Sequence, residues 1–140
     1  MYSKILLAVD GSANNTRAVS DCIELASKIG SSITAIYVVD EGFKNLSMRG
    51  VGGNIKPSLV AEGEKALNNV KRDAELKNVR IETVMKEGHP VDVIVGESEN
   101  YDLVVCGSLG LSGVSKALIG SVSENIVRKA RCPVLVCREK

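Results

Sequence analysis

The sequence contains few aromatic residues and almost no net charge. Aromatic residues make up 3% of its 140 residues, tryptophan is absent, and Phe43 is the only phenylalanine. A surface that stacks the bases of single-stranded nucleic acid needs aromatic side chains, so we expect no such surface. The formal net charge of +1 gives no electrostatic footprint for DNA or RNA either. The basic residues that do gather, Arg128, Lys129 and Arg131, are typical of the last turn of a helix, where cations complement the helix dipole.

Residues that build catalytic centres and metal sites are also scarce. The only histidine, His89, lies between Gly88 and Pro90, a setting typical of a turn or of the start of a helix. The four cysteines include no CxxC pair, and Cys132 and Cys137 should face opposite sides of one predicted strand. We therefore expect free thiols in a reducing compartment, no metal site, and no Ser-His-Asp or Cys-His catalytic set.

Long apolar runs are missing as well, since a membrane span takes about 20 apolar residues and no stretch approaches that length. The apolar run near the N-terminus ends at Asp10, so the run is too short for a signal peptide with its cleavage site. We therefore expect a cytoplasmic protein without a membrane partner. With 44% apolar residues, the chain is predicted to form a single domain over residues 1–140 with its own core.

What the sequence does contain is a regular alternation of apolar strands and amphipathic helices. The predicted strands are short and rich in β-branched residues, and they span Lys4–Asp10, Ile33–Val39, Arg80–Lys86, Leu103–Cys106 and Val134–Cys137. Between them, apolar or small residues recur with helical period: Ala18, Cys22, Leu25, Ala26 and Ile29; then Leu59, Gly63, Ala66, Leu67, Val70 and Ala74; then Val91, Ile94, Val95 and Ser98; then Val122, Ile126, Val127 and Ala130. This order predicts an α/β fold: a five-stranded, parallel, doubly wound sheet with helices on both faces. Residues 40–56 interrupt the pattern and are interpreted either as a lid-like insertion or as a variable surface loop.

Glycines and serines in the last third of the chain form a candidate phosphate site. Neither GxxxxGK[ST] nor a GxGxxG after the first strand is present, which excludes a P-loop NTPase and a standard dinucleotide-binding domain. Instead, Gly107 and Gly110 follow the fourth strand, and residues 120–123 open the last helix in the spacing G-x2-G-x9-G-S. We expect free N–H groups from residues 120–123, hydroxyl donors from Ser121 and Ser123, and a compensating charge from Lys116. The alternative is a glycine turn followed by an ordinary serine-capped helix.

The chain resembles the universal stress protein family over nearly its whole length. The resemblance rests on Lys4–Ser12, Glu87-Gly88, Asp102–Ser108, Gly120-Ser121-Val122 and Cys132–Val136. The glycine spacing is similar to that of the ATP-binding branch of the family. The resemblance implies the strand order 3-2-1-4-5 and an adenine nucleotide alpha hydrolase-like fold, in which the ends of strands 1 and 4 meet at the topological switch point.

The resemblance also implies which residues bind the nucleotide. Asp10 would bond the ribose or the adenine, the backbone of Val38 would meet the adenine edge, and Ala8 and Val9 would line the base pocket. The ribose and phosphates would be held by Gly107, Gly110, Gly120, Ser121, Val122 and Ser123, with Cys106 beside them. Mg²⁺ would arrive with ATP and be held by the phosphate oxygens. Leu109 departs from many members of the family, which have His or Arg there, so a direct polar contact is lost. Asp10 is further expected to close the Asp-Gly-Ser turn and to cap the first helix.

The edges of the implied sheet predict a homodimer. Strand 3 carries Arg80, Glu82 and Lys86, charges that discourage pairing with another chain. Strand 5, with Val134, Leu135 and Val136, has no charge that would do so. We therefore predict a symmetric homodimer joined along strand 5, an assembly that the resemblance also implies.

Nucleotide-responsive regulation with little or no turnover is the function that these patterns predict. Phosphoryl transfer needs a base or an oriented water and a metal ion; Asp10, Asp40 or Glu41 could assist, but nothing in their spacing indicates that role. Two alternatives stay open: a slow ATPase or nucleotide-transferring enzyme, and a dimeric interaction scaffold with an empty cleft.

Overall fold

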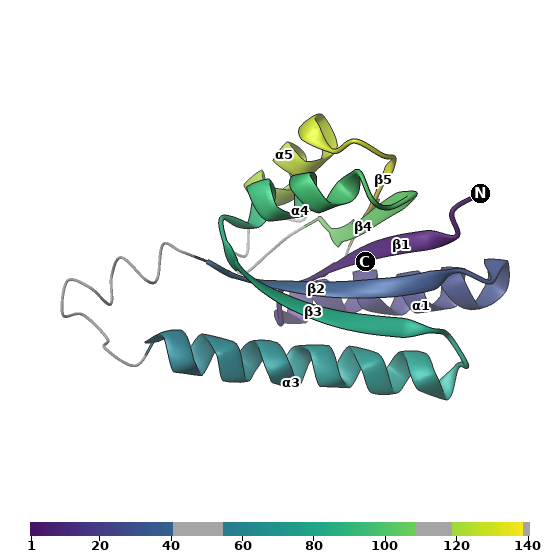
Figure 1. Ribbon diagram of the computed structural model, residues 1–140, viewed down its shortest axis with the longest axis horizontal. Helices are drawn as coiled ribbons and strands as arrows, with labels where there is room; N and C mark the ends of the chain where they lie inside the picture. The colour runs from purple at the N-terminus through teal and green to yellow at the C-terminus, as the bar shows by residue number, and fades with distance from the viewer. Residues whose placement is uncertain (41–54, 109–118, 139–140) are drawn as a thin grey trace.

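The computed structural model describes residues 1–40, 55–108 and 119–138 (Figure 1). Strands and helices alternate along these residues as predicted, with boundaries that differ by a few residues. The elements are β1 (Lys4–Val9), a short 3-10 helix (Ala13–Asn15), α1 (Thr16–Ile29), β2 (Ser32–Asp40), α3 (Ile55–Leu76), β3 (Ile81–Gly88), α4 (Pro90–Ser98), β4 (Leu103–Gly107), α5 (Ser121–Lys129) and β5 (Val134–Cys137). The helices in these residues lack the length and apolar character that a membrane span requires.

The five strands form one parallel sheet in the order β3-β2-β1-β4-β5, which confirms the predicted order. β1 lies in the centre, where Leu7 pairs with Ala35 of β2 on one side and with Val105 of β4 on the other. The chain leaves β1 toward β2 on one side, while β4 occupies the other side. The connections therefore diverge at the carboxyl ends of β1 and β4, and this divergence opens the crevice in which such sheets bind ligands.

Helices cover both faces of the sheet, with α1 and α3 on one face and α4 and α5 on the other (Figure 1). Successive residues of a strand point to opposite faces, so β1 contributes to both cores. Ile5 and Leu7 pack in the larger core under α1 and α3, whereas Leu6 packs with Ile94 and Ile126 in the smaller core under α4 and α5. The apolar runs of the sequence thus correspond to strands buried on both sides.

The inward face of α5 differs from the prediction. Val122 and Val127 were expected to point inward, but they are 42% and 49% exposed, and the buried residues are Ser123 and Ile126. Ser123 occupies the inward position because its hydroxyl donates a hydrogen bond to the carbonyl of Gly107 at the end of β4. In α1 the prediction holds for Ala18, Cys22 and Ala26, but Ile29 at the helix end is 48% exposed.

The predictions for the cysteines are largely confirmed. All four thiols are free, and burial raises the pKa of Cys22 to about 12. Cys132, however, lies before β5 rather than within it, because β5 begins only at Val134. Arg128 and Lys129 lie in the last turn of α5, as expected for cations at a helix C-terminus.

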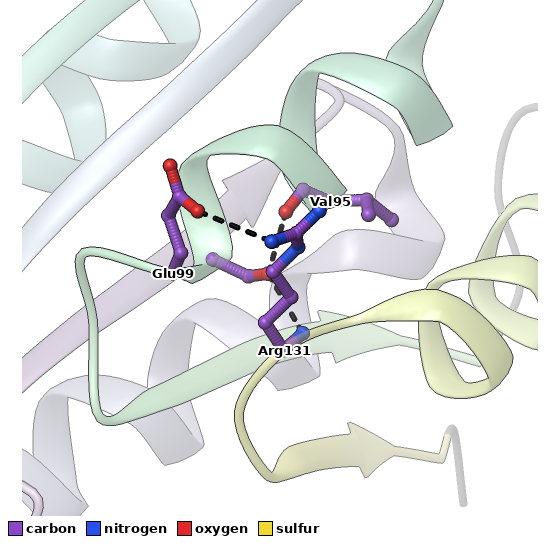
Figure 2. A network of polar contacts seen from close by, with 4 residues as sticks. Val95, Glu99 and Arg131 are labelled. Atoms are coloured by element: carbon purple, nitrogen blue, oxygen red, sulfur yellow. Dashed lines mark hydrogen bonds and ion pairs between the residues drawn. The ribbon is translucent and has the colours of Figure 1, made fainter.

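A polar network ties the end of α4 to the segment between α5 and β5 (Figure 2). The hydroxyl of Ser98, which is fully buried, donates to the carbonyl of Val95 at 2.6 Å and accepts from the backbone N–H of Arg131 at 2.9 Å. The guanidinium of Arg131 also lies 3.4 Å from the carboxylate of Glu99. These contacts join the end of α4 to the segment that follows α5.

Candidate functional site

A cavity of about 300 Å³ lies at the carboxyl ends of the central strands. Its walls come from the ends of β1, β2 and β4 and from the first turn of α5. The residues of the predicted nucleotide site that line it are Ala8, Val9, Asp10, Val38, Cys106, Gly107, Gly120, Ser121, Val122 and Ser123. Gly110 lies outside the described residues, as do Leu109, Lys116 and most of residues 40–56. The structure therefore gathers in one cavity every predicted binding residue that it describes.

Asp10 closes a tight turn at the end of β1, as predicted. Its Oδ1 accepts hydrogen bonds from the backbone N–H of Ser12 at 2.9 Å and from the hydroxyl of Ser12 at 2.7 Å. Gly11, between them, has a φ of 76°, a conformation that favours glycine. Among the residues that the structure describes, both hydrogen bonds to this carboxylate use Oδ1, which leaves Oδ2 available to a ligand.

The expected cap on the first helix is wrong. A turn of 3-10 helix (Ala13–Asn15) intervenes, so α1 begins only at Thr16, and the side chain of its N-cap residue Asn15 forms no capping bond. Asp10 instead stabilises the turn that precedes the 3-10 helix, because its bonds go to Ser12.

Asn15 is a site residue that the sequence reasoning missed. Its side chain is 4% exposed and lines the cavity. The amide Nδ2 donates to the carbonyl of Ala8 at 3.1 Å, and Oδ1 accepts from the backbone N–H of Asp10 at 3.3 Å. Asn15 thus forms hydrogen bonds with the backbone at the end of β1, as a neighbouring strand would. These bonds fix the position of that backbone beside the cavity. Its place three residues after the Asp-Gly-Ser turn is the signal that could have identified it.

The start of α5 differs in two respects from the predicted set of free donors. The N–H of Gly120 is not free, because it donates to the carbonyl of Ser108 at 2.7 Å. The hydroxyl of Ser123 is already used in its bond to the carbonyl of Gly107. Both groups join α5 to the end of β4, where the chain must return to the sheet.

Three amides remain at the start of α5. The first bond within the helix runs from the N–H of Glu124 to the carbonyl of Gly120 at 2.9 Å, so the N–H groups of Ser121, Val122 and Ser123 have no acceptor in the helix. The N-cap residue is Gly120, which has no side chain with which to cap them. The interpretation as an ordinary serine-capped helix is therefore wrong. An uncapped helix start beside a cavity can bind an anion, because its amides and the helix dipole both favour negative charge.

The remaining walls of the cavity are mostly apolar. They consist of residues from β2, α3, α4 and the second turn of α5: Ile36, Tyr37, Val39, Asp40, Leu59, Pro90, Ile94 and Ile126. The pairing of β1 with β2 ends at Val9 and Tyr37, so Val38 borders the cavity beyond the last paired residue of β1. The described lining contains the carboxyl groups of Asp10 and Asp40 but no lysine or arginine. Among the described residues, negative charge on a ligand would therefore be offset mainly by the amides of α5.

Chemically reactive groups are few in the described part of the cavity. Burial raises the pKa of Cys106 to about 11, so its thiol stays protonated and is a poor nucleophile. His89 does not line the cavity; it is the N-cap residue that precedes Pro90 of α4, as predicted, and its Nδ1 lies 3.8 Å from Asp92. Within residues 1–40, 55–108 and 119–138, no group of three or more His, Cys, Asp or Glu side chains is placed to hold a metal ion.

Comparisons with known proteins agree with this architecture. The model of the "Universal stress protein family" matches residues 1–138. The chain is 39% identical to the universal stress protein MJ0531 of Methanocaldococcus jannaschii over 142 residues, which cover 99% of this chain and 84% of that relative.

Solved structures give the same picture of the fold. The hypothetical protein MJ0577 is similar to this chain with a TM-score of 0.85 and 28% identity, over 100% of this chain and 98% of that chain. A universal stress protein family protein of Arabidopsis thaliana, At3g01520, was solved with AMP bound. It matches with a TM-score of 0.71 and 24% identity, over 99% of this chain and 92% of that chain. These matches extend over the sheet and over the helices on both of its faces.

Proposed function

Since the chain belongs to the universal stress protein family, we propose that it binds an adenine nucleotide in the cavity at the ends of β1 and β4. We propose further that ATP is the ligand and that its occupancy regulates a partner, with little or no turnover. The observation that carries the proposal is the uncapped start of α5 beside a largely apolar cavity. One site thus offers amides for phosphates and an apolar wall for a base.

Each part of a nucleotide has a counterpart in the cavity. The base lies against Ala8, Val9 and Val38, where the lining is apolar. Oδ2 of Asp10 accepts a hydrogen bond from a ribose hydroxyl or from the adenine amino group. The amides of residues 121–123 and the hydroxyl of Ser121 donate to the phosphates. A volume of about 300 Å³ suits a ligand of this kind, since pockets for small molecules begin at roughly that size.

The Arabidopsis structure with AMP bound supports the choice of an adenine nucleotide as the probe. Its similarity to this chain is one of fold, so the ligand itself has to be tested here. The direct experiment is calorimetric titration of the purified protein with ATP, AMP and cyclic AMP, beside mass analysis of nucleotide released by denaturation. ATP should bind most tightly because it offers the most phosphate oxygens to α5. Absence of binding by all three at millimolar concentration would refute the proposal and favour the scaffold hypothesis.

Binding without rapid hydrolysis follows from what lines the cavity. Phosphoryl transfer needs a group that orients the attacking water and a metal ion that neutralises developing charge. The described lining includes no histidine, and Mg²⁺ would be held there chiefly by the phosphate oxygens. The carboxylates of Asp10 and Asp40 favour a slow ATPase as the second candidate function. Incubation with ATP and magnesium for hours, followed by chromatography of the products, separates the two, because a regulator of this kind leaves ATP intact.

A homodimer along β5 is part of the proposal. β5 is the edge of the sheet, paired on one side with β4, and Leu135 is 40% exposed there. A second copy pairing along β5 would cover this apolar edge. Light scattering should give twice the mass of the chain, and Leu135→Lys should halve it, because an edge lysine discourages strand pairing. A wild-type protein of monomer mass would refute this assembly without affecting the nucleotide site.

A further inference from the structure

The ring of Tyr37 lies between two glycines from different parts of the chain. Tyr37 lies on β2 and is 6% exposed. A Cβ atom on Gly63 of α3 would lie 2.6 Å from Cδ1 and 2.8 Å from Cε1 of the ring. A Cβ atom on Gly11, in the turn after β1, would lie 3.7 Å from Cε2. The two glycines therefore face opposite edges of the same ring.

Gly63 lowers the stability of the helix that contains it, which indicates that the packing at this position requires a residue without a side chain. It lies inside α3, where a glycine is less favourable than an alanine. The space that it leaves is filled by the tyrosine ring and by the Cε methyl of Met85, at 2.7 Å from the position of a Cβ. The end of a methionine side chain moves easily, but a buried ring does not. A side chain at position 63 therefore requires a shift of the ring or of α3 itself, and we expect the ring to take part.

A ring displaced away from Gly63 would move toward the turn at the end of β1, beside the ligand site. The far edge of the ring faces Gly11, and the neighbouring Asp10 carries the carboxylate that bonds Ser12. Burial, together with the negative charges of Glu62 and Asp10, raises the pKa of Tyr37, so its hydroxyl stays protonated beside these carboxylates. Tyr37 itself also lines the cavity.

We propose that Gly63 and Tyr37 are positioning residues: α3, through the glycine and the ring, sets the place of the Asp10–Ser12 turn at the mouth of the cavity. The consequence for nucleotide affinity rests on the function proposed above, whereas the positioning itself does not. No contact of Gly63 with the ligand is needed, because the effect passes through the ring.

The chain offers a matched control for the test. Gly96 lies inside α4, and a Cβ there would meet nothing within 4 Å. Gly63→Ala and Gly96→Ala therefore make the same chemical change in two helices, one against the ring and one in open space. Backbone NMR without ligand should show shifted amide resonances for Gly11 and Ser12 in Gly63→Ala but not in Gly96→Ala. Unchanged resonances in both variants would overturn the proposal.

Affinity for ATP supplies the second measurement. Gly63→Ala should weaken the Kd by at least about two-fold and by up to roughly one-hundred-and-fifty-fold, the range of coupling between residues in contact, while Gly96→Ala should leave it unchanged. In a Tyr37→Leu background, Gly63→Ala should have no further effect, because the ring that the methyl strikes is gone. An equal loss in both backgrounds would refute Tyr37 as the intermediary.

Two further outcomes keep the test decisive. Tyr37→Leu removes the ring and should bind ATP more weakly than the wild type; equal affinity of the two proteins would overturn the proposal even if Gly63→Ala failed to fold. If the wild-type protein bound no ATP while the amides of Gly11 and Ser12 still shifted in Gly63→Ala, the positioning would stand and the proposed function would fall.

Discussion

Ser121→Pro tests the phosphate site by removing one backbone amide while leaving the fold intact. Ser121 is the first residue of α5, the position at which proline is most readily accepted in a helix. A proline requires an extended conformation in the residue before it, and Gly120 already has φ −63° and ψ 156°. The amide that is lost has no acceptor within the helix, so the helix itself loses nothing.

The expected magnitude follows from the charge of the acceptor. A hydrogen bond to a charged group contributes about 1.5–3 kcal/mol, and each 1.4 kcal/mol changes an affinity about tenfold. If a phosphate accepts from this amide, the Kd for ATP should weaken by roughly ten- to one-hundred-fold. Stability should stay equal or rise by about 0.4–1 kcal/mol, because proline restricts the unfolded chain.

Ser121→Ala is the matched control, since it removes the hydroxyl but keeps the amide. Both variants and the wild type would be titrated with ATP by calorimetry, and their unfolding followed by heat with and without ATP. When the concentration of free ligand is one hundred times the Kd, binding adds about 2.7 kcal/mol to the free energy of unfolding, which a thermal scan detects easily. If Ser121→Pro bound ATP as tightly as Ser121→Ala, the amides of α5 would not hold the phosphates and the proposed site would be refuted.

Three further predictions address other contacts. Asp10→Asn keeps an oxygen for Ser12 but replaces the available carboxylate oxygen with an N–H donor, so calorimetry should show roughly tenfold weaker ATP binding at unchanged melting temperature. Ser98→Ala leaves the N–H of Arg131 without its acceptor, so urea unfolding should show a loss of about 1–3 kcal/mol while ATP affinity stays unchanged; an unchanged unfolding midpoint would contradict the role of the network in Figure 2. The native pKa of Cys22 is raised from 9.0 to about 12, so only the unfolded thiol ionises above pH 9. Stability should therefore fall as the pH rises from 9 toward 12, and Cys22→Ala should reduce that slope in unfolding curves measured at several pH values.

Much of this architecture could be predicted because strands buried on both faces differ from amphipathic helices in a simple pattern. Ile5, Leu6 and Leu7 form a continuous apolar run, whereas Ala18, Cys22 and Ala26 recur with helical period. The order of the strands could not be predicted from this pattern. It came from the resemblance to a family, because which strand pairs with which depends on contacts between distant residues.

The details of α5 that sequence reasoning missed depend on contacts with another segment of the chain. The periodicity of α5 gave Val122 and Val127 as inward residues, since apolar side chains usually are. The structure instead buries Ser123, because the carbonyl of Gly107 needs a donor at that point. Likewise, the amide of Gly120 looked free because its acceptor, the carbonyl of Ser108, lies directly after β4. A local pattern identifies the groups that can bond, but only the fold decides which are already bonded.

That distinction bears on how the cavity would respond to a ligand. The groups at its rim divide into two sets: those that bond the protein to itself, such as the hydroxyl of Ser123 and the side chain of Asn15, and those left over, such as Oδ2 of Asp10 and the first amides of α5. The first set already holds the second in place before any nucleotide arrives. Because these groups are already ordered, ligand binding should cost them little conformational entropy. Each remaining donor or acceptor should therefore contribute nearly its full hydrogen-bond energy. The same arrangement means that a variant which breaks the first set should lose both stability and affinity, whereas one confined to the second set should lose affinity alone.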